Sequence, residues 1–127
     1  MKYLAASLTA LSMLFGATSA NAGSGQLDSY CSPTSDFCQE LVRDDGRVKA
    51  QLSTFSFRGK IQLCVQDPPA TGHRFCEKFR LRSKAHGIYL SRVTLSRHFD
   101  FEFPGRYSVS WRFAGTKIGK TLHFRRR

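Results

Sequence analysis

The chain has 127 residues, a formal net charge of +11 and four cysteines, and 41% of its residues are hydrophobic. After an apolar run near the N-terminus, no segment approaches the roughly 20 apolar residues that a membrane-spanning helix requires. There is also no H-E-x-x-H or G-x-S-x-G motif. The sequence therefore predicts a non-enzymatic protein with no cofactor, no metal site and no transmembrane segment in its mature chain.

Residues 1–22 have the pattern of a secretory signal peptide. Lys2 gives the positive start, residues 4–17 form a mainly apolar region, and residues 20–22 read Ala-Asn-Ala, a small-residue cleavage site. We therefore expect a secreted protein, extracellular or periplasmic, whose mature chain begins near Gly23. The alternative is an uncleaved N-terminal anchor.

The rest of the chain fits one domain. Residues 23–30 are small and polar and predict a flexible leader, and residues 31–127 predict a single β-sandwich domain. A chain of this size buries roughly 60–65% of its unfolded surface, which is enough for a core.

The positive charge lies mostly in the second half of the chain. Residues 23–67 carry five Lys/Arg against six Asp/Glu, whereas residues 68–127 carry fourteen against three. This asymmetry favours an anionic partner.

The alternation of apolar and polar residues predicts about seven strands and no helix in the domain. The predicted strands are residues 37–43, 48–57, 60–67, 73–84, 88–99, 106–113 and 120–125. Residues 44–46 read Asp-Asp-Gly, a typical hairpin turn between the first two. In the second strand, Leu52 and Phe55 lie in opposite phases, so we expect a bulge or a bend near Ser53 and Thr54.

The segment 73–84 has the alternation of a strand with one basic face. Phe75, Phe79 and Leu81 share one phase and are expected to reach the core. Glu77 shares that phase, so it is expected to pair with a cation or to lie at the margin of the sheet. The opposite phase holds Arg74, Cys76, Lys78, Arg80, Arg82 and Lys84.

Four cysteines in an exported chain of this size predict two disulfides. A hairpin centred on Ala70 places Cys64 directly opposite Cys76, and both face outward by strand phase. We therefore predict an exposed Cys64–Cys76 bridge, and Cys31–Cys38 follows by elimination. A metal site built from all four cysteines is disfavoured because no C-x-x-C spacing is present.

The strand rhythm resembles that of a small secreted immunoglobulin-like β-sandwich. The stretch 103–111, Phe-Pro-Gly-Arg-Tyr-Ser-Val-Ser-Trp, is similar to the start of strand F in that fold. The resemblance implies that Tyr107 hydrogen-bonds back to upstream backbone. Val109 stands where antibody domains have their second cysteine, and Trp111 lies on this strand instead of strand C, so the closer resemblance is to fibronectin type III domains.

The resemblance also implies a sheet in which residues 120–125, 106–113, 60–67 and 73–84 are neighbours. Its outward face is then basic and suits phosphate or sulfate groups. The candidate polyanion-binding residues are Lys60, Arg74, Lys78, Arg80, Arg82, Lys84, Arg106, Arg112 and Arg125. Candidate ligands are teichoic acid, lipopolysaccharide, extracellular nucleic acid and sulfated glycans. Base-specific recognition is disfavoured because the aromatic residues are expected to point inward.

Three other interpretations are open. The basic strand, as an edge strand, could carry its charges only to prevent aggregation. Alternatively, the domain could bind a protein partner, as an inhibitor or adhesion module, through loops such as residues 67–73. Finally, His98, Asp100 and Glu102 form the single local acid–base cluster, for which a solvated turn is the favoured interpretation.

Overall fold

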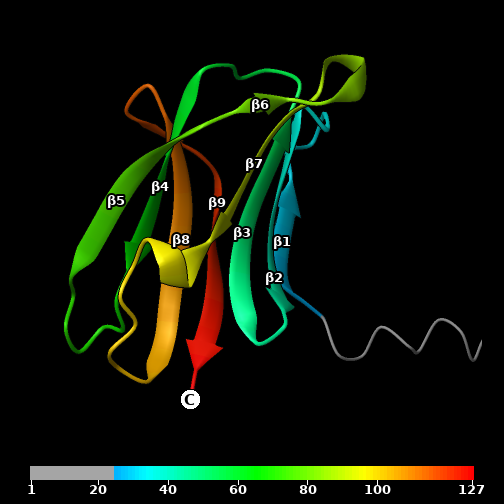
Figure 1. The fold of residues 1–127 in the computed structure, drawn as a ribbon. Coiled ribbons are helices and arrows are strands. Elements are labelled where there is room, and N and C mark those ends of the chain that lie inside the picture. Colours follow the sequence, from blue (N-terminus) through cyan, green and yellow to red (C-terminus); the bar gives the residue numbers. More distant parts are fainter. Residues whose placement is uncertain (1–24) are drawn as a thin grey trace, which may run out of the picture.

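A computed structural model describes residues 25–127, which form two antiparallel β-sheets packed face to face (Figure 1). One sheet contains, in spatial order, β1 (Gly25–Cys31), β2 (Phe37–Asp44), β3 (Arg47–Thr54), β7 (Tyr89–Thr94) and β6 (Arg82–Ser83). The other contains β5 (Arg74–Arg80), β4 (Lys60–Gln66), β8 (Gly105–Phe113) and β9 (Thr116–Arg126). Short 3₁₀ turns, Ala85–Gly87 and Leu95–Arg97, flank β7. The predicted all-β sandwich is confirmed, and the predicted signal peptide lies outside the described residues.

The core lies between the sheets and is built by alternate residues of the strands. On β8, Tyr107, Val109 and Trp111 are completely buried, as the alternation predicts. Leu41 of β2 and Leu63 of β4 are also completely buried. Burial of such side chains contributes about 1.5–3 kcal/mol each. Trp111 is the single tryptophan of the sequence, so its fluorescence reports on the core.

The predicted flexible leader is wrong over most of its length, because Gly25–Cys31 forms strand β1 beside β2. None of its residues is buried, so its sequence carries little apolar alternation. Its backbone hydrogen bonds with β2 hold it in place, and these depend on pairing rather than on side-chain pattern. The described residues therefore contain nine strands, against about seven predicted.

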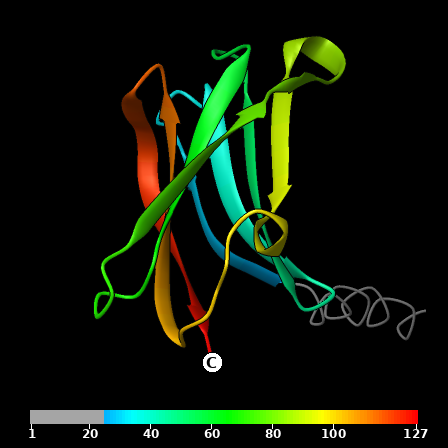
Figure 2. The same ribbon diagram turned by 60° about the vertical axis from the view of Figure 1, so that its left-hand side comes forward.

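The predicted single strand 73–84 is divided between the two sheets. β5 ends at Arg80, Leu81 is buried, and β6 pairs with β7 in the other sheet. The Leu81 N–H donates to the carbonyl oxygen of Gly59 (2.7 Å), which anchors the crossing point. Figure 2 shows β5 running obliquely across the molecule toward β6. The alternation of cations continues through this crossing without a glycine or proline, so the sequence pattern does not reveal it.

Two predicted strands end earlier than expected. β3 ends at Thr54, whose Oγ1 accepts hydrogen bonds from the N–H groups of Ser56 (2.9 Å) and Phe57 (3.2 Å). The change of phase predicted near Ser53 and Thr54 is a bend at Phe55 and Ser56, where the chain leaves the sheet, and no bulge interrupts the β2–β3 register. Similarly, β7 ends at Thr94 and a 3₁₀ turn follows it.

Strand β9 is longer than predicted and contains a wide bulge. It begins at Thr116, and its register shifts by two extra residues between the pairs Trp111–Ile118 and Val109–Leu122. Gly119 lies in this bulge with φ of +65°, a conformation that favours glycine. The bulge turns the backbone of Lys120 toward the opposite sheet, where it meets the buried side chain of Gln39.

Both predicted disulfides are confirmed, Cys31–Cys38 between β1 and β2 and Cys64–Cys76 between β4 and β5. Cys64 is directly opposite Cys76, as the hairpin register predicts. Cys76 is exposed but Cys64 is 2% exposed, so the bridge is exposed at its β5 end alone. The disulfide therefore ties an edge strand to the body of the sheet.

Candidate functional site: a basic sheet face

The outer face of the β5-β4-β8-β9 sheet gathers most of the predicted cationic residues. We call this surface the basic face. Its cationic residues are Lys60, Arg74, Lys78, Arg80, Arg106, Arg112, Lys117 and Arg125. Side chains of directly paired residues share one side of a sheet, so the strand register fixes their arrangement.

The register groups these cations on both sides of the Cys64–Cys76 bridge. On one side, Lys60 pairs with Arg80, and the next row contains Lys78, Gln62, Arg112 and Lys117. Successive rows lie about 6.6–6.8 Å apart, which is two residues along a strand. Five cations from four different strands therefore lie in two adjacent rows of the sheet.

On the other side of the bridge, Arg74 is paired with Gln66, and Arg106 with Arg125. Arg74 also contacts the disulfide itself, because its Nη2 lies 3.8 Å from Sγ of Cys64. The basic face therefore has two cationic groups separated by an uncharged row.

A surface hollow of about 250 Å³ lies within the first group. Four cations line it, Arg58, Lys60, Lys78 and Arg112, together with Gln62 and the turn after β8. Arg112 is held in place because its Nη2 donates to the carbonyl oxygen of Gly115 (3.0 Å). Guanidinium and ammonium groups that converge in this way suit one phosphate or sulfate group.

These positive charges have no acidic partners among the described residues. The four strands of the sheet contain one acidic residue, Glu77, whose Oε2 lies 3.3 Å from Nδ1 of His98. Glu77 thus lies on an edge strand, at the margin of the sheet, as its phase predicts, and its partner is an imidazole. Within residues 25–127, the ion pairs involve Lys49, His73 and His98, and none of the lysines or arginines of the basic face. The face is therefore free to attract an external anion.

His123 of β9 also lies on this face, and the positive charge of the face affects its pKa. Partial burial lowers the pKa of His123 from its usual 6.5, and the charges of Arg106, Lys120 and Lys117 lower it further. The carboxylate of Asp28 opposes this effect, and its Oδ2 accepts a hydrogen bond from the His123 backbone N–H (2.9 Å). Nδ1 of the ring lies 3.1 Å from Oγ of Ser108.

We expect His123 to titrate below pH 6.5 in an NMR titration of the folded protein, and the Arg106→Gln variant to titrate at higher pH. The unfolded chain binds the proton more tightly, so the contribution of His123 to stability is present above pH 6.5 and declines as the pH falls from 6.5 toward the folded pKa. A midpoint at or above 6.5 in the unaltered protein would contradict this interpretation. A polyanion on the basic face should raise the midpoint, because it offsets the surrounding positive charge.

Three of the predicted residues do not lie where the sequence places them. Arg82 and Lys84 lie in or next to β6, so they belong to the other sheet and line a separate pocket with Arg92. Phe75 is 52% exposed instead of buried. The cause is that β5 runs obliquely at the edge of the sandwich. Phe79 is half-buried, and every other residue of this strand is exposed.

Lys117 of the basic face and Arg58, which lines the hollow beside it, are absent from the predicted set. The sequence predicts that the last strand begins at Lys120 and so leaves Lys117 in the preceding loop, whereas β9 begins at Thr116. Arg58 lies in the turn before β4, where no alternation applies, and its guanidinium also lies 5.2 Å from the ring centroid of Tyr89. An earlier start for β9 could have been found from Ile118, which continues the inward phase.

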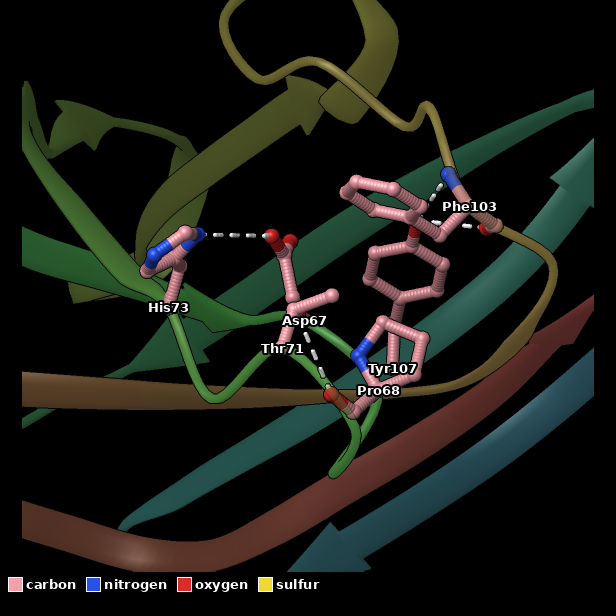
Figure 3. A network of polar contacts seen from close by, with 6 residues as sticks. All are labelled: Asp67, Pro68, Thr71, His73, Phe103 and Tyr107. Carbon is pink, nitrogen blue, oxygen red and sulfur yellow. Dashed lines mark hydrogen bonds and ion pairs between the residues drawn. The ribbon is translucent and has the colours of Figure 1, made fainter.

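The loop 67–73, the predicted alternative binding site, is rigid and lies beside Tyr107 (Figure 3). The Asp67 N–H donates to the His73 carbonyl oxygen (2.7 Å), and Thr71 Oγ1 donates to the Pro68 carbonyl oxygen (3.1 Å). The Tyr107 hydroxyl donates to the carbonyl oxygen of Phe103 (2.7 Å), which is the bond to upstream backbone that the resemblance implies. Phe103 is 40% exposed beside this loop.

His98, Asp100 and Glu102 do not form an acid–base site, which agrees with the favoured interpretation of a solvated turn. His98 pairs with Glu77 and lies edge-on to Phe79 with ring centroids 4.8 Å apart, while Asp100 and Glu102 are exposed. No group of three or more metal-ligating side chains occurs in the part of the chain that the structure describes. Nor does any helix in that part reach the length and apolarity needed to cross a membrane.

No protein-family model matches the chain, and no curated protein or solved structure is significantly similar to it. Its function is therefore inferred from its own residues and their geometry.

Proposed function

We propose that the protein is an exported, non-enzymatic module that binds anionic polymers through its basic face. The observation that carries this proposal is the set of eight lysines and arginines on one face of a sheet, with no acidic partner among the described residues. A repeating anion can contact several of them at once, and each contact with a polymer phosphate releases condensed counterions. The ligand class is a phosphate- or sulfate-bearing polymer such as teichoic acid, lipopolysaccharide, extracellular nucleic acid or a sulfated glycan.

We also propose that the sandwich is immunoglobulin-like and closest to the fibronectin type III kind. The order β5-β4-β8-β9 agrees with the sheet that this resemblance implies, and the bond from Tyr107 to Phe103 agrees with its corner tyrosine. Folds of this class support many functions, so this assignment adds little to the proposed activity.

The alternative that the charges only protect an edge strand explains part of the pattern. It accounts for Lys78 and Arg80, because β5 is an edge strand. It does not account for Lys60 and Arg112, which lie on the interior strands β4 and β8. Cations on both central and edge strands favour a ligand over simple protection.

The test compares two variants that lose the same charge from different sheets. Lys60→Gln/Lys78→Gln/Arg80→Gln removes three charges from the basic face, and Arg82→Gln/Lys84→Gln/Arg92→Gln removes three from the opposite sheet. Binding of the oxidised protein to a fluorescent single-stranded nucleic acid, a teichoic acid, lipopolysaccharide and a sulfated glycan is measured across a salt series. For the nucleic acid, we expect the first variant to reduce the salt slope by about 2–3 and the second to leave it nearly unchanged.

Equal losses in both variants would mean that net charge, and not the basic face, attracts the polymer. Absence of salt-sensitive binding to every probe would overturn the proposal.

The second candidate function is binding of a protein partner through the loop 67–73. The specific observation in its favour is the exposure of Phe75 and Phe103, which gives apolar anchors near a rigid loop. Such binding should persist at high salt, and it should be lost in the Phe75→Ser/Phe103→Ser variant but not in the Lys60→Gln/Lys78→Gln/Arg80→Gln variant.

A further inference from the structure

A second pocket lies at one end of the sandwich and is separate from the hollow of the basic face. It has a volume of about 710 Å³, which is within the range of small-molecule sites. It opens where the β2–β3 turn and the end of β9 lie at the same end of the molecule (Figure 1). We call it the end pocket.

The floor of the end pocket is apolar and rigid. Phe124 is stacked on Tyr107 with ring centroids 5.4 Å apart, and Phe101 meets both rings edge-on at 5.5 and 4.9 Å. Phe101 and Phe124 line the pocket together with Val48 and Leu27. Interlocked aromatic rings of this kind offer a fixed surface to an apolar ligand group.

Leu27 is directed by an irregularity of β1. The register of β1 with β2 shifts between Gln26 and Asp28, so Leu27 is the extra residue of a bulge. Bulges re-aim a side chain and recur next to binding sites. Leu27 is 37% exposed, and its exposed side chain forms part of the lining of the end pocket.

The rim of the end pocket is cationic, and strand phase places two arginines on its inner side. Arg43 follows Leu41 on the inward phase of β2, and Arg126 follows Phe124 on the inward phase of β9. Where the core pattern would continue with apolar residues, both strands therefore carry a guanidinium. Arg43 Nη2 is also 3.5 Å from the carbonyl oxygen of Arg125, which links the two strands across the pocket.

No aspartate or glutamate lines the end pocket, while Arg47 and the residues Arg125–Arg127 add further positive charge. The acidic residues next to the lining in sequence are Asp28, Asp44, Asp45, Asp100 and Glu102. Asp28 accepts a hydrogen bond from the His123 backbone N–H (2.9 Å), Asp44 is paired with Lys49 (2.9 Å), and the other three are exposed. The pocket thus combines an apolar floor with several arginines and has no acidic side chain in its lining.

We propose that the end pocket binds an amphipathic anion, a molecule with one phosphate, sulfate or carboxylate head group and an apolar chain. The head group accepts hydrogen bonds from Arg43 and Arg126, and the apolar chain packs on Phe101, Phe124 and Leu27. Guanidinium forks match the geometry of such head groups, and burial of the chain supplies affinity that a free inorganic anion lacks. This ligand class differs from the polymers proposed for the basic face, so the two sites are tested separately.

The probe for the test is decyl phosphate below its micellar concentration, with binding to the full, oxidised protein followed by calorimetry and by NMR of Leu27, Phe101 and Phe124. We expect saturable binding with one site and resonance changes at these residues. Arg43→Gln/Arg126→Gln should weaken binding about tenfold or more. Leu27→Ser, which keeps every charge, should also weaken it, and unchanged Trp111 fluorescence checks that the variants are folded.

The matched control is Lys60→Gln/Lys78→Gln, which loses the same charge from the basic face and should bind decyl phosphate as the unaltered protein does. Inorganic phosphate should bind far more weakly because it lacks the chain. Equal weakening in this control, or undiminished binding in Arg43→Gln/Arg126→Gln, would overturn the proposal. Binding that is not saturable would also overturn it.

A final arm identifies the source of the ligand. Vesicles of phosphatidylcholine with phosphatidic acid present the same head group within a bilayer. Vesicle binding that is lost in Arg43→Gln/Arg126→Gln supports the site and assigns it to a membrane lipid. Monomer binding without vesicle binding supports the site and assigns it to a free amphiphile.

Discussion

Replacement of both Cys64 and Cys76 by alanine is expected to lower the free energy of unfolding by about 3 kcal/mol and to release β5 from the sheet. The bridge spans a sequence separation of 12, for which the loop-entropy relation gives a contribution of this size. Loss of the bridge should also weaken polymer binding, because β5 carries Arg74, Lys78 and Arg80.

Loss of the Cys64–Cys76 bridge should affect β5 most, because few other contacts hold this strand in the sheet. It is an edge strand that pairs with β4 alone, and six of its seven residues are exposed. The buried apolar surface that stabilises the other strands is therefore small here. A strand with this little burial depends on its backbone ladder and on the disulfide.

The matched control removes the other bridge by Cys31→Ala/Cys38→Ala. This bridge has a sequence separation of 7 and ties β1 to β2, so its loss should cost about 2.5 kcal/mol without affecting β5. Denaturant unfolding followed by Trp111 fluorescence gives the stability, and hydrogen exchange gives the protection of β5. Unchanged protection of β5 amides in Cys64→Ala/Cys76→Ala would contradict the prediction.

Replacement of Gln39 by leucine is expected to lower the free energy of unfolding by about 3 kcal/mol. The Gln39 side chain is 1% exposed and joins the two sheets. Its Nε2 donates to the carbonyl oxygen of Lys120 (2.9 Å), and its Oε1 accepts from the Lys120 N–H (2.8 Å). Leucine would leave both backbone groups without partners, at about 1–3 kcal/mol each.

Gln51→Leu is the matched control, because Gln51 is half-buried on the neighbouring strand β3 and contacts the side chain of Arg92 (2.8 Å) instead of backbone. We expect its effect to stay within about 0.5 kcal/mol. Chemical denaturation measures both variants. A loss below about 1 kcal/mol in Gln39→Leu would show that the bulge of β9 satisfies its own backbone groups.

The features that the sequence predicts well are those set by local alternation and by pairing within one hairpin. Tyr107, Val109 and Trp111 alternate without interruption, so the buried face of β8 follows directly. The hairpin register from Cys64 to Cys76 likewise follows from the symmetric loop between them. Six of the eight cations of the basic face could be placed from these patterns, because β4, β5 and β8 are close to their predicted ranges.

The features that the sequence does not predict depend on contacts between distant segments. The polar strand β1 is held by β2, and the crossing at Leu81 is fixed by a hydrogen bond to Gly59. The bulge at Gly119 is shaped by Gln39, which is 80 residues away in the sequence and would meet a side chain placed there. The end pocket is lined by residues of β1, β2, the β2–β3 turn, the segment after β7 and the end of β9, so no single stretch of sequence indicates it.

The twist of the sheet that carries the basic face limits how much of this face a stiff polymer can contact. Adjacent strands rotate by about 20–25°, so the directions of β5 and β9 differ by roughly 60–75° over the four strands. A flexible polymer can follow this curved array and engage both cationic groups beside the disulfide. A stiff rod such as duplex DNA, with a persistence length of about 50 nm, can lie along only part of it. The fold thus favours ligands by their stiffness as well as by their charge.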